Sequence, residues 1–219
     1  MRCWIDTDVG GDPDDAIALW CALRHPDVDV VGVSTVDGDV ARRAGIAREL
    51  LARAGHPEVP VVAGPPPEGF DGADALLAIG PWTHVAGAPR LPRRVALMGG
   101  LLAPLVHRGE LVTVDWNVAQ DPAAADLVLR RGHPLLVVPL DTTVTVVCTD
   151  DERAAIARAV PEVDAWGHPL VLHDPLALLA LTADVAVRVE RRAVRGVVHD
   201  VVVAADAAAA RARVVELCT

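Results

Sequence analysis

Residues 6–19 read Asp-Thr-Asp-Val-Gly-Gly-Asp-Pro-Asp-Asp-Ala-Ile-Ala-Leu and place five carboxylates within ten residues. The segment follows a short strand-like stretch, residues 3–5, and leads into a stretch of helical character at 15–24. A strand, a loop and a helix are therefore predicted in that order. Open α/β sheets place their ligand sites at such strand-to-helix loops, so this stretch decides both the predicted fold and the predicted site.

The rest of the chain alternates apolar runs of strand length with amphipathic runs of helix length. This pattern is typical of parallel strands joined by crossover helices. Further strands are predicted at 28–36, 59–63, 75–79, 95–98 and 135–140, and further helices at 41–54, 122–131, 150–159 and 175–182. The alternation at 197–203 and the alanines at 207–210 predict an antiparallel ribbon followed by a short helix. We predict one α/β domain over residues 1–219, with an open, mostly parallel sheet and flanking helices.

The composition narrows the classes of function. With 219 residues, 52% of them hydrophobic, the chain is long enough for one sizeable core. The net charge is −10, every basic side chain is Arg, and no basic stripe occurs, which argues against nucleic acid as a partner. The cysteines form no C-x-x-C pair and are expected to be reduced. Since no signal-like or membrane-spanning apolar run occurs, we expect a cytoplasmic protein that does not bind membranes.

The acidic cluster has several chemical interpretations. Helix capping accounts for one or two of the carboxylates. Unit charges about 4 Å apart repel by about 1 kcal/mol even in water, so the full cluster favours a bound cation, and oxygen ligands suit Ca²⁺ or Mg²⁺ better than Zn²⁺. An EF-hand fails because Ile17 stands where its bidentate Glu should be. A phosphatase of the haloacid-dehalogenase class, using Asp6 and Asp8, fits the D-x-D pattern but not the glycines and the acidic pair that follow.

Several segments together resemble the inosine-uridine nucleoside hydrolase family. The acidic loop resembles the family's D-T-D-x-G-x-D-x-D-D-A-x-A-L motif. Further segments follow in the family's order at 33–38 (VSTVDG), 78–86 (AIGPWTHVA), 98–100 (MGG), 115–122 (DWNVAQDP) and 173–177 (HDPLA). Ordered matches over most of the chain are much more specific than any one of them.

The resemblance implies a glycosidase that cleaves the N-glycosidic bond of a ribonucleoside or related riboside to ribose and free base. It implies Ca²⁺ held by Asp8, Asp15, Asp174 and the backbone carbonyl of Ile79. Asp8 would also be the general base on the metal-bound water, because Ca²⁺ acidifies water only weakly. A homodimer or homotetramer is expected from the family.

The resemblance also implies a set of substrate contacts. Asp14 would bond a ribose hydroxyl, Asn117 the sugar hydroxyls and Asp115 the 5′-hydroxyl. His173 would be the acid for the leaving base. For Asn117 the competing interpretation is a helix-entry residue, and for His173 a buried core histidine. His84 and His107 are expected to be structural or exposed; they are outside this set.

The chain departs from the family pattern at two places. Asp39 stands where the family usually has Asn, so it is either a sugar contact or only the cap of the helix at 41–54. The long segment that covers the base in the family is reduced here to residues 65–72. Trp82 and Trp116 lie in site motifs and are the aromatics available to stack on a base. An alternative to the enzyme is a degenerate member that binds Ca²⁺ and a ribosyl ligand without turnover.

Overall fold

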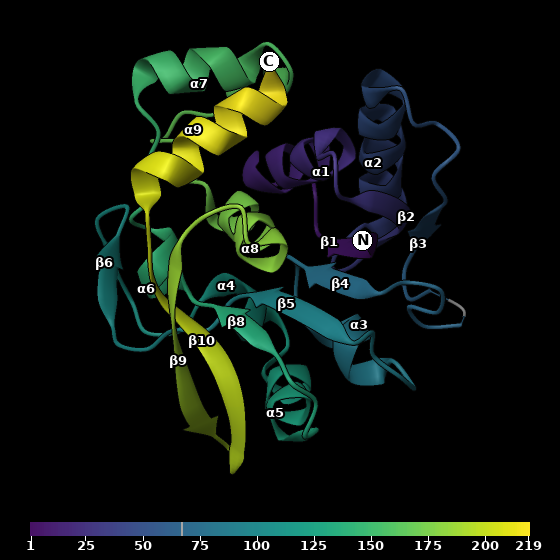
Figure 1. Ribbon diagram of the computed structural model, residues 1–219, viewed down its shortest axis with the longest axis vertical. Coiled ribbons are helices and arrows are strands. Elements are labelled where there is room, and N and C mark those ends of the chain that lie inside the picture. Colours follow the sequence, from purple (N-terminus) through teal and green to yellow (C-terminus); the bar gives the residue numbers. More distant parts are fainter. Residues whose placement is uncertain (67) are drawn as a thin grey trace.

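The computed structural model describes residues 1–66 and 68–219; Pro67, in the short proline segment, lies outside the described residues. Within the described residues an eight-stranded sheet forms the middle layer, with helices on both of its faces (Figure 1). Its strands are β1 (Arg2–Thr7), β2 (Asp29–Thr35), β3 (Val61–Ala63), β4 (Ala75–Ala78), β5 (Arg94–Met98), β8 (Leu136–Val138), β9 (Val187–Val194) and β10 (Val197–Ala205). The strand order is β3-β2-β1-β4-β5-β8-β10-β9, and every pair is parallel except β10 with β9. The predicted α/β class is confirmed.

The predicted strands are all present, and several of them lie in the core. In β4 all residues are buried, as expected for a central parallel strand that is covered on both faces. The strand predicted at 135–140 is shorter than expected, because β8 ends at Val138 and helix α6 begins at Leu140. Pro139 lies between them, and a proline cannot donate to the strand ladder.

The helices cover the two faces unequally. They are α1 (Asp14–Arg24), α2 (Val40–Ala54), α3 (Thr83–Gly87), α4 (Trp116–Gln120), α5 (Pro122–Arg130), α6 (Leu140–Thr143), α7 (Asp150–Ala157), the 3₁₀ turn η1 (Pro161–Val163), α8 (His173–Thr182) and α9 (Ala207–Cys218). Helix α1 packs against α2, α8 and α9 on one face, and α3 packs against α5 on the other (Figure 1). The helix predicted at 175–182 begins two residues earlier, at His173, because Pro175 is tolerated in a first turn.

The C-terminal ribbon joins the main sheet. Strands β9 and β10 are antiparallel, as predicted, but β10 also pairs in parallel with β8 and extends the sheet. Helix α9 then returns to pack against α7 and α1 (Figure 1). Cys21 and Cys218 lie there with their sulfurs 4.0 Å apart, and the cysteines of the described residues are free thiols. The sequence pattern showed the ribbon, but the alternation of residues is local and does not indicate which strand it joins.

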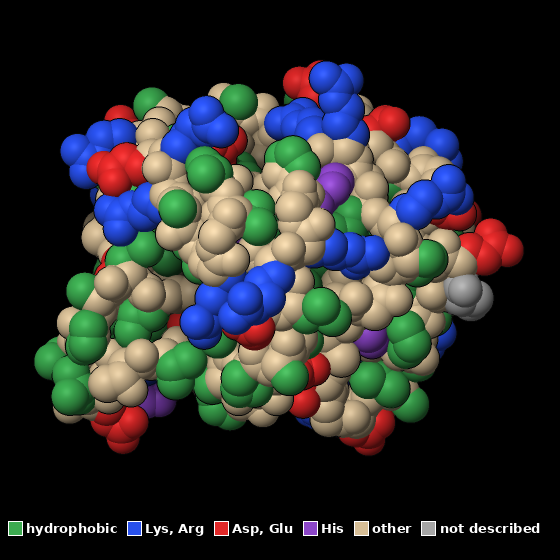
Figure 2. Space-filling model, turned by 90° about the horizontal axis from the view of Figure 1, so that it is seen from below, with side chains coloured by type: hydrophobic (Ala, Val, Ile, Leu, Met, Phe, Trp, Pro, Cys, Tyr) green, Lys and Arg blue, Asp and Glu red, His purple; other side chains and the backbone are tan. Residues whose placement is uncertain are grey.

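A second, small sheet was not predicted. Strands β6 (Leu105–His107) and β7 (Glu110–Val112) form a hairpin apart from the main sheet (Figure 1). Its turn residues Arg108 and Gly109 have φ angles of 52° and 83°, the left-handed pair that a tight two-residue hairpin turn requires. Across the described residues, none of the helices is long and apolar enough to cross a membrane. On the face shown in Figure 2, arginine and acidic side chains are interspersed with apolar ones.

The sheet topology determines where a site can form. Successive strands are added outward from β1 to β2 and β3 on one side, and from β4 to β5 and β8 on the other. The order therefore reverses between β1 and β4, and the loops at their carboxyl ends diverge to leave a crevice. The acidic loop follows β1, and Ile79 follows β4, so both lie at this crevice.

Candidate functional site

A cavity of about 540 Å³ lies at the carboxyl ends of the central strands. Its inner wall comes from the acidic loop, the starts of α1 and α8, and the loop after β4. Its outer wall comes from the β6–β7 hairpin and the segment that leads into α4. Most of the residues predicted for the site line this cavity.

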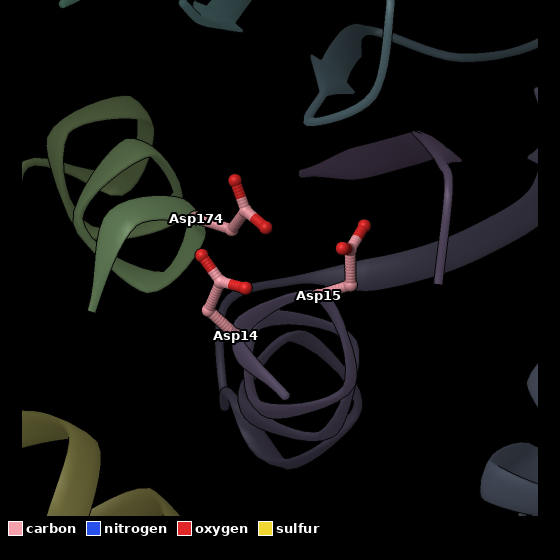
Figure 3. A group of neighbouring side chains, drawn as sticks. All are labelled: Asp14, Asp15 and Asp174. Atoms are coloured by element: carbon pink, nitrogen blue, oxygen red, sulfur yellow. The ribbon is translucent and has the colours of Figure 1, made fainter. Parts of the chain in front are cut away.

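A carboxylate cluster forms the inner wall. Asp14 and Asp15 are the first two residues of α1, and Asp174 is the second residue of α8. One carboxylate oxygen from each lies within 4.8 Å of the others, and all three residues are buried. Figure 3 shows the side chains reaching into a shared space from the ends of two helices. Because both helices present their N-terminal ends here, the positive ends of two helix dipoles face the carboxylates.

A hydroxyl from β1 holds the cluster in position. The Thr7 Oγ1 donates to Asp15 Oδ1 at 2.5 Å and accepts the backbone N–H of Val9 at 3.1 Å. Thr7 thus ties the last residue of the strand to the first turn of α1. The sequence analysis did not single out Thr7. Its position between two aspartates of the D-T-D motif was the available signal.

The electrostatics of the cluster call for a cation. Burial, reinforced by neighbouring carboxylates, raises the pKa of Asp14 to about 7. The same causes raise the pKa of Asp15 and of Asp174 well above the usual carboxyl range. Burial also raises the pKa of Asp8 to about 6, although the Arg43 guanidinium opposes that shift. Carboxylates crowded in this way ionise together only when a positive charge joins them, and their oxygens are the donors that hard divalent ions prefer.

Asp8 lies against the loop that follows β4. A Cβ added at Gly80 would lie 3.0 Å from both the backbone nitrogen and the Oδ1 of Asp8, so this close approach requires glycine. The structure brings the predicted ligands Asp15 and Asp174 together and places Asp8 and Ile79 on the same cavity. It also adds Asp14 to the cluster, where the sequence analysis expected a sugar contact.

Asn117 and Asp115 line the cavity, and their hydrogen bonds here are structural. The Asn117 Nδ2 donates to the carbonyl oxygen of Ile79 at 2.9 Å and so orients the predicted backbone ligand. Asp115 caps α4 and accepts the backbone N–H groups of Gly100 at 2.8 Å and Val118 at 3.0 Å. Burial raises the pKa of Asp115, and the backbone donors oppose that shift. Sugar contacts from both residues remain predictions.

Two aspartates of the predicted motifs lie away from the cavity wall. Asp39 is exposed and caps α2 by accepting the backbone N–H of Arg42 at 3.0 Å. Of the two roles considered for Asp39, a sugar contact or a helix cap, the structure shows the cap. Asp6 has an exposed fraction of 0% and pairs with Ser34 Oγ at 2.5 Å and His84 Nδ1 at 2.9 Å. The burial of Asp6 argues against a phosphatase that uses Asp6 and Asp8 together. His84 is structural, as expected.

Two histidines lie side by side in the cavity. His173 is buried, with Nδ1 2.7 Å from Thr143 Oγ1, and its ring meets that of His107 edge-on at 5.5 Å. Burial, reinforced by His107 and Arg108, lowers the pKa of His173 to about 3. The imidazole is then neutral at pH 7, which works against its predicted role as an acid. His107 was expected to be structural or exposed, yet it forms part of the cavity wall.

The outer wall is exposed and partly apolar. Trp116, which lines the cavity, is 67% exposed, and on the hairpin face that does not line the cavity Val106 and Leu111 are 71% and 70% exposed. Trp116 lines the cavity, so it is the aromatic available to a base, whereas Trp82 is buried in the core. A 2.7 Å ion pair between Arg108 and Asp12 connects the hairpin to the acidic loop.

That ion pair joins the turn of the hairpin to the inner wall. The Arg108 guanidinium contacts the Asp12 carboxylate. The Cζ atom of Arg108 also lies 4.9 Å from the centre of the Trp166 ring. Neither contact was predicted, because each joins residues far apart in the sequence; Arg108 and Asp12 are 96 positions apart. The hairpin therefore forms a wall of the cavity that is joined to the acidic loop.

The chain is similar to known nucleoside hydrolases. The family model described as inosine-uridine preferring nucleoside hydrolase matches residues 3–75 and 72–217. A probable uridine nucleosidase 2 of Arabidopsis thaliana is 28% identical over 209 residues, which span 71% of this chain and 64% of that protein. The pyrimidine-specific ribonucleoside hydrolase RihB of Escherichia coli is 28% identical over 207 residues, again 71% of this chain and 64% of the relative.

Solved structures match over nearly the whole fold. An inosine-uridine preferring nucleoside hydrolase of Bacillus anthracis superposes with a TM-score of 0.78 at 20% identity and covers 99% of this chain and 98% of its own. A plant nucleoside hydrolase superposes with a TM-score of 0.77 at 19% identity and covers 100% and 98%. At these identities the structures show the shared fold. Because the family model extends over almost all of the sequence, the chain belongs to the inosine-uridine preferring nucleoside hydrolase family.

Proposed function

We propose that this protein is a Ca²⁺-dependent hydrolase that cleaves the N-glycosidic bond of a ribonucleoside or related riboside. Hydrolysis of that bond is the family's reaction. The observation that carries the proposal for this chain is the buried cluster of Asp14, Asp15 and Asp174 at the point where the strand order reverses. A position at the switch point is where open α/β sheets bind their ligands.

The donor set suits a hard divalent ion. The cluster consists of carboxylates, and no sulfur or imidazole ligand lies within this group of the described residues. We assign Asp8, Asp15, Asp174 and the Ile79 carbonyl to the ion, with Asp14 beside them for a ribose hydroxyl. Irregular oxygen donors favour Ca²⁺ over Zn²⁺. When bound, the ion supplies the positive charge that lets the carboxylates stay ionised together, and it offers coordination to ribose hydroxyls.

The chain's own residues then carry the hydrolysis. Asp8 accepts a proton from the attacking water at its carboxylate. As the base departs with the bonding electrons, positive charge develops on the sugar, and the ionised carboxylate of Asp14 stabilises it. Water supplies hydroxyl to the anomeric carbon, the departing base takes a proton from solvent water, and Asp8 afterwards returns its proton to solvent. Asn117 keeps the Ile79 carbonyl directed at the site.

Protonation of the departing base is the step that this site is least equipped to assist. His173 is the predicted acid, and its low pKa in the buried pocket works against that role. The exposed outer wall also leaves the base side open to water. We therefore expect leaving groups that need no protonation, such as p-nitrophenolate, to depart much more readily than purine or uracil.

A substrate panel tests the proposal. Inosine, uridine, p-nitrophenyl riboside and p-nitrophenyl phosphate are incubated with Ca²⁺-loaded protein and with chelator-treated protein. We expect cleavage of ribosides only, lost with chelator and restored by Ca²⁺. Cleavage of the phosphate, or riboside cleavage that resists chelation, would contradict the proposal. Binding of ribose and Ca²⁺ without turnover would identify the alternative, a member that binds its ligand only. A homodimer or homotetramer and a cytoplasmic location stay predictions.

A further inference from the structure

Arg43 lies in the cavity wall, and neither the motifs nor the proposed mechanism uses it. It belongs to α2, and its side chain is 16% exposed. Its Nε donates to the carbonyl oxygen of Asp37 at 2.9 Å, and its Nη1 donates to that of Val9 at 3.2 Å. The guanidinium thus joins the loop after β2 to the loop after β1.

The third nitrogen of this guanidinium has spare donors. Nη2 lies 3.9 Å from Asp8 Oδ2 and 3.6 Å from Asp37 Oδ2, both beyond hydrogen-bonding distance. Within the part of the chain that the structure describes, it donates no hydrogen bond. Because Arg43 lines the cavity, an acceptor that enters the cavity can reach this nitrogen. The other two nitrogens hold the group in place, which lowers the entropy cost of binding.

Arg43 Nη2 and Asp8 Oδ2 are 3.9 Å apart, so one oxygen atom placed to the side of the line between them can reach both. An oxygen about 2.8 Å from each group would accept from Nη2 and donate to the Asp8 carboxylate. A hydroxyl has both capacities, whereas an ether or a base carbonyl can only accept. The sequence analysis expected a polar contact to the sugar from this loop at Asp39, but Asp39 is exposed and caps α2. Arg43, one turn further along the same helix, faces the cavity instead.

We propose that Arg43 is a substrate-binding residue that donates from Nη2 to a ribose hydroxyl shared with Asp8. The inference rests on the proposed function, because it requires a riboside in this cavity. It adds a specificity element, since a riboside that lacks this hydroxyl would leave both Arg43 and Asp8 without their partner. The contact also aligns the sugar with the general base.

Variants of Arg43 measure this contact. Arg43→Gln and Arg43→Lys are compared with the parent and with Arg42→Gln, the neighbour whose side chain is exposed and does not line the cavity. With p-nitrophenyl riboside we expect KM to rise about tenfold to a hundredfold in Arg43→Gln, the usual cost of a hydrogen bond to a charged group. Arg43→Lys should recover part of that loss. KM is measured at saturating Ca²⁺, with the Ca²⁺ affinity of each variant determined by calorimetry, because Arg43 lies 3.9 Å from Asp8. KM and Ca²⁺ affinity of Arg42→Gln should stay at the parent values.

Deoxy analogues separate a substrate contact from a structural effect. Parent and Arg43→Gln are compared on the 2-, 3- and 5-deoxy forms of p-nitrophenyl riboside in a double-mutant-type cycle. For one of these analogues the penalty of the substitution should disappear, because the hydroxyl that Arg43 contacts is already missing. An equal penalty on all of them, or a KM unchanged by Arg43→Gln, would overturn the inference.

The two proposals fail in different ways. If the parent cleaves no riboside, the proposed function fails, and calorimetry of ribose with Ca²⁺-loaded protein still tests Arg43. Weaker ribose binding in Arg43→Gln, with thermal stability near that of the parent, would support the contact. Equal ribose affinity in the two proteins would overturn it.

Discussion

The inner wall of the cavity is made of buried residues on core helices, whereas the outer wall is made of surface segments. The inner wall places Asp14, Asp15 and Asp174 on two helices that are packed together in the core, and the carboxylates are buried. The outer wall is a short hairpin and the entry to α4, with Trp116 exposed to water. Positions on core helices are precise, whereas a surface hairpin tolerates change. We infer that the sugar half of the site is rigid and the base half is adaptable.

This contrast predicts that variants of the inner wall are far more damaging than variants of the outer wall. The largest effect is expected for Asp8→Asn, because it removes the general base while preserving the shape of the side chain. Turnover of p-nitrophenyl riboside should fall by about two to four orders of magnitude. Steady-state kinetics measures it, and circular dichroism checks the fold. An unchanged kcat would remove Asp8 from the mechanism.

The cation site gives the next largest effect. Asp15→Ala and Asp174→Ala should each weaken Ca²⁺ binding by about a hundredfold or more. Mutation of a residue that only hydrogen-bonds to a metal ligand already lowers metal affinity by up to about a hundredfold, and loss of the ligand itself should cost at least as much. Calorimetry on chelator-stripped protein measures the affinity. Asp39→Ala is the control, because this exposed aspartate caps α2 outside the cavity. Parental affinity in both inner-wall variants would show that the site is wrongly placed.

Proton competition provides a third test of the inner wall. The raised pKa values of Asp8, about 6, and Asp14, about 7, mean that the cation-free protein holds protons on these groups at pH 5 and has lost most of them at pH 7.5. Their contribution to stability is present at low pH and is lost as the pH rises through these values. Ca²⁺ should therefore raise Tm more at pH 7.5 than at pH 5, with affinity rising about tenfold per pH unit for each proton displaced. A Ca²⁺ effect independent of pH would contradict the raised pKa values.

On the outer wall, Trp116→Ala should have a moderate and selective effect. Loss of an aromatic partner at an exposed site costs about 1 kcal/mol, so KM for inosine or uridine should rise by about tenfold or less. Inhibition by free ribose should keep its parental constant, because ribose has no base to stack. Equal weakening of both ligands would show that Trp116 supports the inner wall as well.

The smallest effect is expected at the tip of the hairpin. Arg108→Gln breaks a partly exposed ion pair with Asp12, and such pairs contribute about 0 to 1 kcal/mol. KM should change by a few-fold at most, and Tm should barely move. Arg130→Gln is a matched control, because Arg130 pairs with Asp126 on the exposed side of α5. A loss of activity comparable with that of Asp8→Asn would show that the hairpin belongs to the catalytic machinery.

The sequence by itself determined much of this protein. Periodicity and apolar runs indicated the strands and helices, because burial on one face or two leaves a local pattern. The acidic loop by itself indicated a cation site, because crowded carboxylates require compensation. The resemblance of that loop and of the later H-D-P segment to the family implied Asp8, Asp15 and Asp174 as the ligands, which stays a prediction. Proline and cap residues located most element ends, as Asp121 before Pro122 does for α5.

Only the tertiary structure decided how these elements meet. The pairing of β10 with β8, the ion pair of Arg108 with Asp12 and the burial of Asp6 each depend on residues far apart in the sequence. The direction of Arg43 into the cavity and of Asp39 away from it depends on how α2 packs against α1. Local patterns record whether a side chain is buried, but contacts between distant segments are set by the packing of the whole core, which no single stretch of sequence contains.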